Sequence, residues 1–144
     1  MIRQATIEDI GRIAEILVFN KRINFYPIFQ DVQYSFKELN VVDTASELLD
    51  TYYNFYVYDD GVIKGIMEID GHELVTLYVD SFFQNEGIGS KLVQYAIEKH
   101  HIQFLWALEK NVKAIRFYKR HGFIVTEEKK FEEDTTEYLV KLKR

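Results

Sequence analysis

The amino-acid sequence predicts a mixed α/β fold, of the α+β kind, in which helices flank a mostly antiparallel central sheet. Two Asp-Gly turns separate three runs rich in β-branched and aromatic residues, which is a strong signal for successive hairpins. An amphipathic helical pattern and then another apolar run follow them. Strand, helix and strand in succession indicate a parallel crossover. The predicted element order is β-α-α-β-β-β-α-β-α-β-β.

The first part of the chain is predicted to form a short strand and two helical regions. Thr6 and Asp9 are spaced as a capping box in front of a helix. Similar capping signals occur in two later pairs, Ser35 with Glu38 and Thr44 with Glu47. The predicted segments are a strand at 2–4, a helix at 7–20, an ordered aromatic loop broken by Pro27 at 23–29, and a second helical region that ends near Asp50.

The middle and the end of the chain alternate between strand and helix patterns. Asn111 takes the N-cap position of the last helix, which runs through Arg120 and is stopped by Gly122. The predicted segments are a meander at 55–58, 62–69 and 73–79 with turns at Asp60-Gly61 and Asp70-Gly71, a helix from Ile88 to near His100, a strand at 104–107, and closing strands at 123–130 and 137–143.

Length and composition favour a single domain, residues 1–144, with a substantial apolar core. Hydrophobic residues make up 47% of the chain, and 11 Phe, 10 Tyr and 1 Trp are among them. The absence of cysteine excludes disulfides, thiolate metal sites and cysteine nucleophiles. A net charge of −5 disfavours nucleic-acid binding. The sequence has neither a signal-peptide pattern nor an apolar run of about 20 residues, so we expect a cytoplasmic protein without membrane contact.

The turn Gln84-Asn85-Glu86-Gly87-Ile88-Gly89-Ser90 leads directly into a predicted helix. Backbone N–H groups at a helix start lack partners and favour anions, so a diphosphate suits this turn, and Lys91 could add a cation. The alternative is that Gly87 and Gly89 only let the chain reverse. The turn has no Gly-Lys-Ser/Thr ending and no third dinucleotide-type glycine, which excludes both common nucleotide-binding motifs.

Two motifs in this part of the chain resemble the GNAT N-acetyltransferase superfamily. Leu77-Tyr78-Val79-Asp80, followed by Gln84-x-x-Gly87-x-Gly89, is similar to its acyl-coenzyme A signature. Asn111-x-x-Ala114-x-x-Phe117-Tyr118, followed by Gly122-Phe123, is similar to its next motif. The predicted element order also matches that fold. The resemblance is strong over residues 73–123 and weak over the first 50 residues.

The resemblance implies acetyl-coenzyme A as co-substrate and direct transfer of its acetyl group to a primary amine in a ternary complex. The acceptor, a small molecule or a peptide, is not identified by the sequence. The alternative is a non-catalytic acyl-coenzyme A sensing or protein-interaction module on the same fold. The sequence does not decide between a monomer and a homodimer.

The resemblance also implies a role for individual residues. Tyr118 would be the general acid that protonates the departing thiolate, and a tyrosine packed in the core is the alternative. Asn111 would contact the cofactor, although helix capping alone also explains it. The remaining implied cofactor-binding residues are Leu77, Tyr78 and Val79 for the pantetheine arm, and Gln84, Asn85, Glu86, Gly87, Ile88, Gly89, Ser90 and Lys91 for the pyrophosphate.

A general base is predicted less directly. Glu73 precedes Val79 by six residues, where some members of the superfamily carry a catalytic glutamate, and strand alternation places it on the face of Leu77 and Val79. Glu68 and Asp70 on the neighbouring strand are alternatives, and a chain of water molecules is another.

Three features depart from the motif or suggest other chemistry. Glu86 places a negative charge in the turn, where a basic residue or glycine is frequent, and Asn85 and Ser81 replace a frequent glycine and proline. No metal is expected, because the adjacent His100 and His101 would diverge on a helix. Aromatic residues of the first part of the chain have two interpretations, core packing or the wall of an acceptor pocket: Phe19, Phe25, Tyr26, Phe29, Tyr34 and Phe36.

Overall fold

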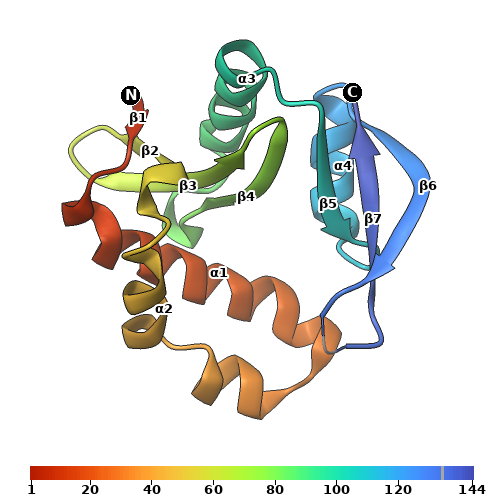
Figure 1. The fold of residues 1–144 in the computed structure, drawn as a ribbon, viewed down its shortest axis with the longest axis horizontal. Coiled ribbons are helices and arrows are strands. Elements are labelled where there is room, and N and C mark those ends of the chain that lie inside the picture. The colour runs from red at the N-terminus through yellow and green to blue at the C-terminus, as the bar shows by residue number, and fades with distance from the viewer. Residues whose placement is uncertain (134) are drawn as a thin grey trace.

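The computed structural model describes residues 1–133 and 135–144, and its element order is the predicted one (Figure 1). Short helical turns at Ile7–Asp9, Tyr34–Glu38, Tyr52–Asn54 and Ser81–Phe83 link the main elements. The main elements are β1 (Ile2–Gln4), α1 (Ile10–Phe29), α2 (Val41–Leu48), β2 (Phe55–Asp59), β3 (Ile63–Asp70), β4 (Glu73–Val79), α3 (Ile88–His100), β5 (Phe104–Leu108), α4 (Val112–Arg120), β6 (Ile124–Phe131) and β7 (Tyr138–Lys143).

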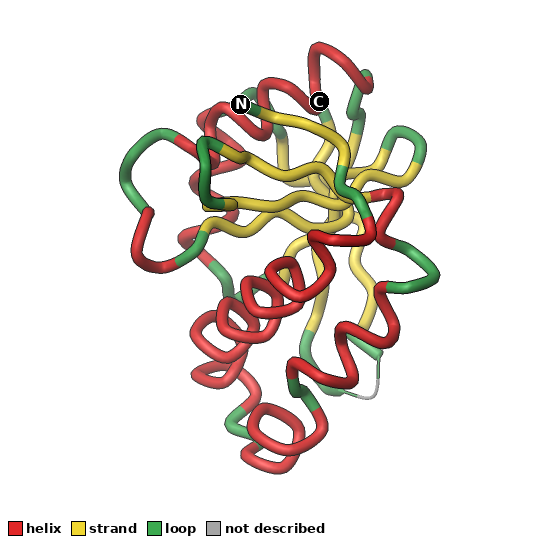
Figure 2. Tube along the Cα trace, turned by 90° about the vertical axis from the view of Figure 1, so that its left-hand side faces the viewer, coloured by secondary structure: helices red, strands yellow, loops and turns green. Residues whose placement is uncertain are grey.

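The strands form one 7-stranded sheet in the order β1-β2-β3-β4-β5-β7-β6. All neighbouring strands are antiparallel except β4 and β5, which are parallel. The mixed, mostly antiparallel sheet and the parallel crossover are therefore confirmed. Figure 1 shows β5, β7 and β6 turned away from the four strands that precede them, and Figure 2 shows the strands with helices around them.

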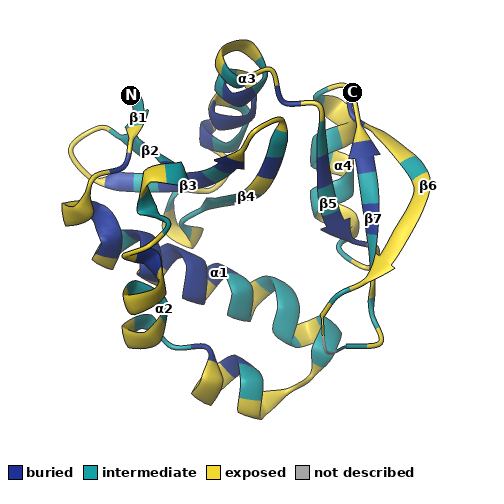
Figure 3. Ribbon diagram, viewed as in Figure 1, coloured by how far each residue is buried: buried dark blue, intermediate teal, exposed yellow. Residues whose placement is uncertain are grey.

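Helices cover the sheet on two sides and create two cores. On one side, α3 packs through Leu92 and Val93, both fully buried, against Met67 of β3 and Leu105 of β5. On the other side, α1 packs through Ile13 against β2 and β3. Figure 3 shows the buried stripe of α1 facing the sheet. Truncating one of these side chains to alanine should cost about 2–5 kcal/mol.

Helix α1 is longer than predicted, because the aromatic stretch at 23–29 is helical. Pro27 removes only one N–H donor, and the helix ends two residues later at Phe29. Gln30 then takes a left-handed conformation (φ 53°) and donates its N–H to the Tyr26 carbonyl at 2.8 Å. Phe25 meets Phe29 one turn away, with ring centroids 6.0 Å apart. These contacts outweigh the local preference of proline for ending a helix.

Helix α2 also begins differently from the prediction. The N-cap is Asn40, whose Oδ1 accepts a hydrogen bond from the Asp43 N–H at 2.9 Å, and Thr44 lies inside the helix. Ser35 is buried within the helical turn Tyr34–Glu38. The Thr6–Asp9 capping box is present, since the Thr6 N–H donates to the Asp9 carboxylate at 2.8 Å. It opens the short turn that runs directly into α1.

The meander has both predicted turns and one irregularity. The pairing of β3 with β4 shifts between Glu68 and Ile69: Glu68 pairs with Thr76, whereas Ile69 pairs with Leu74. Val75 is therefore an extra residue in β4, which is a β-bulge. Among the residues that the structure describes, no helix has the length and apolar character needed to cross a membrane.

Candidate active site

Strands β4 and β5 pair with each other at only one end. Their aligned pair is Glu73 with Phe104, while β4 continues to pair with β3 as far as Val79. Among the described residues, the edge of β4 that faces β5 therefore has no strand partner at residues 77–79. Backbone groups on such an edge can accept an extended ligand as an added strand.

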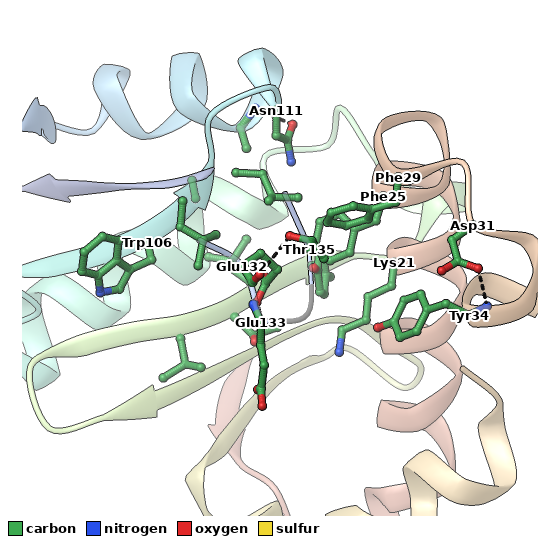
Figure 4. Close-up of a pocket in the computed structure, with 18 of the residues that line it drawn as sticks. Lys21, Phe25, Phe29, Asp31, Tyr34, Trp106, Asn111, Glu132, Glu133 and Thr135 are labelled. Atoms are coloured by element: carbon green, nitrogen blue, oxygen red, sulfur yellow. Dashed lines mark hydrogen bonds between the residues drawn. The ribbon is translucent and has the colours of Figure 1, made fainter. Parts of the chain in front are cut away.

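A cavity of about 610 Å³ lies beside this opening (Figure 4). Four of the predicted site residues line it: Leu77, Tyr78, Asn111 and Tyr118. The rest of the lining comes from α1 and the turn after it, from β4, β5, α4 and β7, and from the β6–β7 connection: Lys21, Phe25, Phe29, Asp31, Tyr34, Glu38, Val75, Thr76, Trp106, Ala107, Leu108, Ala114, Glu132, Glu133, Thr135 and Leu139. Segments far apart in the sequence thus build one cavity.

The turn before α3 presents free backbone amides. Gly87 has φ +80° and Asn85 has φ 65°, and helix α3 begins at Ile88. Lys91 is the first residue here whose N–H finds an acceptor, the Gly87 carbonyl at 3.1 Å. In the described chain, no hydrogen bond takes up the N–H groups of 88–90. These groups stand at the positive end of a helix and suit a phosphate.

Helices α3 and α4 are held close together at this turn. A Cβ atom added at Gly89 would lie 3.3 Å from the ring of Phe117, so only glycine fits without displacing the ring. Ser90 Oγ lies 3.1 Å from His121 Nε2 at the end of α4. Burial, helped by Arg120 and Arg144, lowers the pKa of His121. A neutral imidazole therefore borders the turn at physiological pH.

The two charged residues at this turn, Glu86 and Lys91, interact with residues of neighbouring strands. The ammonium of Lys91 lies 5.6 Å from the centroid of the Tyr58 ring, over β2. The charge of Glu86 acts on Lys64, whose pKa is raised mainly by its hydrogen bond with Asp60 and in smaller part by Glu86. Lys64 thus offsets part of the negative charge that Glu86 adds beside the amides.

Tyr118 packs in the core and also lines the cavity. Its ring packs edge-on against Phe117 and Phe123, at centroid distances of 5.2 and 5.8 Å. Its hydroxyl has no hydrogen-bond partner in the described part of the chain, and the residue lines the cavity. Burial raises the pKa of Tyr118, as it does that of Tyr78 on the facing strand. Tyr118 therefore keeps its proton at neutral pH.

The face predicted for Glu73 is wrong. Leu74 belongs to the same core as Leu77 and Val79, so Glu73, the next residue along the strand, points to the opposite face. The bulge at Val75 causes this change, because one extra residue reverses the alternation upstream of it. Glu73 lines neither of the two cavities around this site.

Glu68 lies closer to the site than Glu73. It lines an adjoining cavity of about 350 Å³, which shares Lys21, Tyr34, Glu38 and Thr76 with the larger one. Burial raises the pKa of the Glu68 carboxyl, while Lys21 acts in the opposite direction. The sequence named Glu68 only as an alternative. It gave no signal for Lys21 or Glu132, which belong to α1 and the β6–β7 connection, outside both motifs.

The other histidines contact neighbouring residues, and the aromatic residues of the first part of the chain fall into two groups. His100 packs against Tyr56 at 4.7 Å between ring centroids, and His72 Nδ1 lies 3.1 Å from the His101 carbonyl. Over the residues described, no three His, Cys, Asp or Glu side chains are grouped to hold a metal ion. The early aromatic residues divide: some line the 610 Å³ cavity, namely Phe25, Phe29 and Tyr34, whereas Phe19 and Phe36 are about half exposed outside it.

Relatives of this chain are acetyltransferases. In sequence, it is 32% identical over 75 residues to the peptidyl-lysine N-acetyltransferase YiaC of Escherichia coli K12, a match that covers 51% of each chain. The chain therefore spans about half the length of this curated relative.

Solved structures share the fold over nearly the whole chain. An N-acetyltransferase from Staphylococcus aureus Mu50 superposes with a TM-score of 0.78 and 18% identity, covering 99% of this chain and 98% of that one. The PaiA N-acetyltransferase of Thermoplasma acidophilum, in complex with coenzyme A, gives a TM-score of 0.70 and 20% identity, covering 100% and 98%. The family model described as "Acetyltransferase (GNAT) domain" matches residues 51–125, more than half of the chain, so this protein belongs to the GNAT acetyltransferase family.

Proposed function

We propose that this protein transfers the acetyl group of acetyl-coenzyme A to a primary amine. The observation that carries the proposal is the opening between β4 and β5, which has a cavity on one side and the free amides of the α3 turn beside it. One ligand matches all these parts: an extended chain with a diphosphate at one end and a reactive thioester at the other.

Donor binding is assigned to backbone groups more than to side chains. The amides of 88–90, set by the left-handed Gly87, would hold the pyrophosphate. The free edge of β4 at 77–79 would pair with the pantetheine arm, and Asn111 borders the same cavity. Because the Asn111 side chain already accepts the Ala114 N–H at 3.3 Å, its amide nitrogen is the group left for the ligand.

We propose direct attack in a ternary complex. The amine nitrogen forms a bond to the thioester carbonyl carbon, the C–S bond breaks, and the thiolate takes the proton of Tyr118. The nitrogen gives up a further proton as the amide forms, and this proton restores the Tyr118 hydroxyl. A tyrosine whose pKa is raised by burial keeps that proton until the thiolate departs. The chain contains no cysteine that could carry the acetyl group in between.

The acceptor ammonium must lose a proton before it can attack. We propose that Glu68 accepts this proton through water in the adjoining cavity, because burial raises the pKa of its carboxyl toward neutrality. Glu73, predicted from the sequence, is the alternative: it pairs with Asp70 on the same face of the sheet as Glu68, but it lines neither cavity.

For assembly, we propose a homodimer, with a monomer as the alternative. Strand β6 is an edge of the sheet, and Ile124 and Phe131 on it are 71% and 57% exposed. Sedimentation of the purified protein distinguishes the two states, and a monomer at high concentration would exclude the dimer.

Release of coenzyme A tests the proposed activity. The purified protein is incubated with acetyl-coenzyme A and single amines: amino acids, diamines, aminoglycosides and lysine peptides, which the name of the E. coli relative suggests. Thiol release that requires an amine, with formation of the N-acetyl product, is the expected result. If no amine is acetylated while acetyl-coenzyme A still raises the melting temperature, the protein is the non-catalytic binding module instead.

A further inference from the structure

Lys21 stands on α1 where the two cavities of the site meet, and it lines both of them. Figure 4 shows its ammonium beside the ring of Tyr34, turned away from the helix. The residue is partly buried, and its Nζ stays accessible from the cavity. Within the described chain, Nζ makes neither a hydrogen bond nor an ion pair. The mechanism above does not use this ammonium.

Partial burial without a paired anion favours the neutral form of an ammonium. Burial lowers the pKa of Lys21, and the more distant charges of Glu47, Glu68 and Glu132 only partly oppose this. A leucine or methionine at this position would fill the same space without an unpaired charge. An anionic group that enters the cavity would pair with Nζ and keep Lys21 charged.

The rest of the cavity wall carries the opposite charge. Among the residues that the structure describes, four carboxylates line it, from Asp31, Glu38, Glu132 and Glu133, and these attract a cation. A ligand that carries only positive charges would meet repulsion from Lys21, and one that carries only negative charges would meet repulsion from the carboxylates. A zwitterion satisfies both the ammonium of Lys21 and the carboxylates, and Phe25 and Phe29 add apolar surface for a side chain.

We propose that Lys21 binds a carboxylate of the acceptor, and that the acceptor is therefore a small molecule with an amine next to a carboxylate, of the amino-acid class. This inference rests on the proposed acetyltransferase function and specifies its substrate. In the reaction, the amino nitrogen forms the amide bond as the C–S bond breaks. The proton of the ammonium leaves through water to Glu68, and Tyr118 protonates the thiolate.

Pairs of acceptors that differ only in the carboxylate test the proposal. Phenylalanine is compared with phenethylamine, leucine with isoamylamine, and lysine with cadaverine, each by coenzyme A release. For the wild type, kcat/KM should be about 10- to 100-fold higher for the carboxylated member, the range of one charge-assisted hydrogen bond. Lys21→Met should remove this preference by raising KM for the amino acid, with KM for acetyl-coenzyme A unchanged. Lys21→Arg, which keeps the charge, should retain part of it.

A binding measurement covers the case in which turnover is slow. With coenzyme A present, N-acetylphenylalanine should raise the melting temperature of the wild type and not that of Lys21→Met, whereas N-acetylphenethylamine should not distinguish the two. If decarboxylated amines equal or exceed the amino acids in the wild type, and Lys21→Met leaves the ratio unchanged, the carboxylate proposal is wrong while the acetyltransferase function stands. If no amine of either kind is acetylated and no product binds, both proposals fail.

Discussion

At the scale of the residue, the proposed chemistry depends on the hydroxyl of Tyr118. Tyr118→Phe keeps the ring that packs against Phe117 and Phe123 and removes only the proton donor. We expect kcat to fall about 10²- to 10⁴-fold, the usual contribution of a general acid, with KM for acetyl-coenzyme A unchanged. Steady-state kinetics check this. The matched control is Tyr95→Phe, a tyrosine outside the cavity, which should keep full turnover. Unchanged turnover in Tyr118→Phe would remove the residue from the mechanism.

Glu68 makes a pH-dependent prediction at the same scale. Burial raises the pKa of its carboxyl in the folded protein above its value of about 4.3 in the unfolded chain. Its contribution to stability is therefore fully present below that unfolded value and is lost as pH rises through the folded pKa. Glu68→Gln should raise the melting temperature at neutral pH, and the difference should vanish near pH 4.

The same variant tests Glu68 as proton acceptor. Glu68→Gln should slow turnover near neutral pH, whereas Glu73→Gln, which lines neither cavity, should leave it unchanged. The reverse result, with turnover lost only in Glu73→Gln, would assign the base to the residue that the sequence pattern favoured. Stability curves over pH and kcat for both variants are the measurements.

At the scale of the element, the start of α3 depends on one left-handed glycine. Gly87→Ala adds a methyl group that meets no atom within 4 Å, but at φ +80° it strains the backbone. We expect a cost of about 1–2 kcal/mol in the free energy of unfolding, and weaker binding of acetyl-coenzyme A because the amides turn.

A second glycine provides the control for this prediction. Gly11→Ala, on the exposed side of α1 and also free of contacts, should stabilise the protein by about 0.5–1 kcal/mol without affecting binding. Urea unfolding and calorimetric titration measure the two effects. Equal affinity for acetyl-coenzyme A in both variants would contradict the role given to the turn.

Local sequence patterns are sufficient to predict some of the elements and not others. The meander, α3 and α4 are correctly predicted, because Asp-Gly turns, amphipathic spacing and Asn111 are local signals. Helix α1 passes through Pro27 because its aromatic side chains pack on one another and across to the following turn, as Tyr26 does on Phe36 at 5.2 Å. The bulge at Val75 likewise has no local signal, which is why alternation placed Glu73 on the wrong face.

At the scale of the whole molecule, the two halves of the site differ in how far the sequence reveals them. The proposed donor half lies on two contiguous motifs, and its residues Leu77, Tyr78, Asn111 and Tyr118 meet around one cavity. The acceptor half combines Lys21 on α1 with Glu132 after β6, more than a hundred positions apart. Only the fold brings these two together, so no spacing rule could have paired them.

The proposed function requires that the folded chain bind acetyl-coenzyme A at the α3 turn and along β4. Calorimetric titration of acetyl-coenzyme A into the purified protein tests this most directly. We expect saturable binding at one site per chain, weakened in Gly87→Ala and unchanged in Gly11→Ala. At about 100 times the dissociation constant, the ligand should add about 2.7 kcal/mol to the free energy of unfolding. No heat of binding and no rise in melting temperature at millimolar acetyl-coenzyme A would contradict the account.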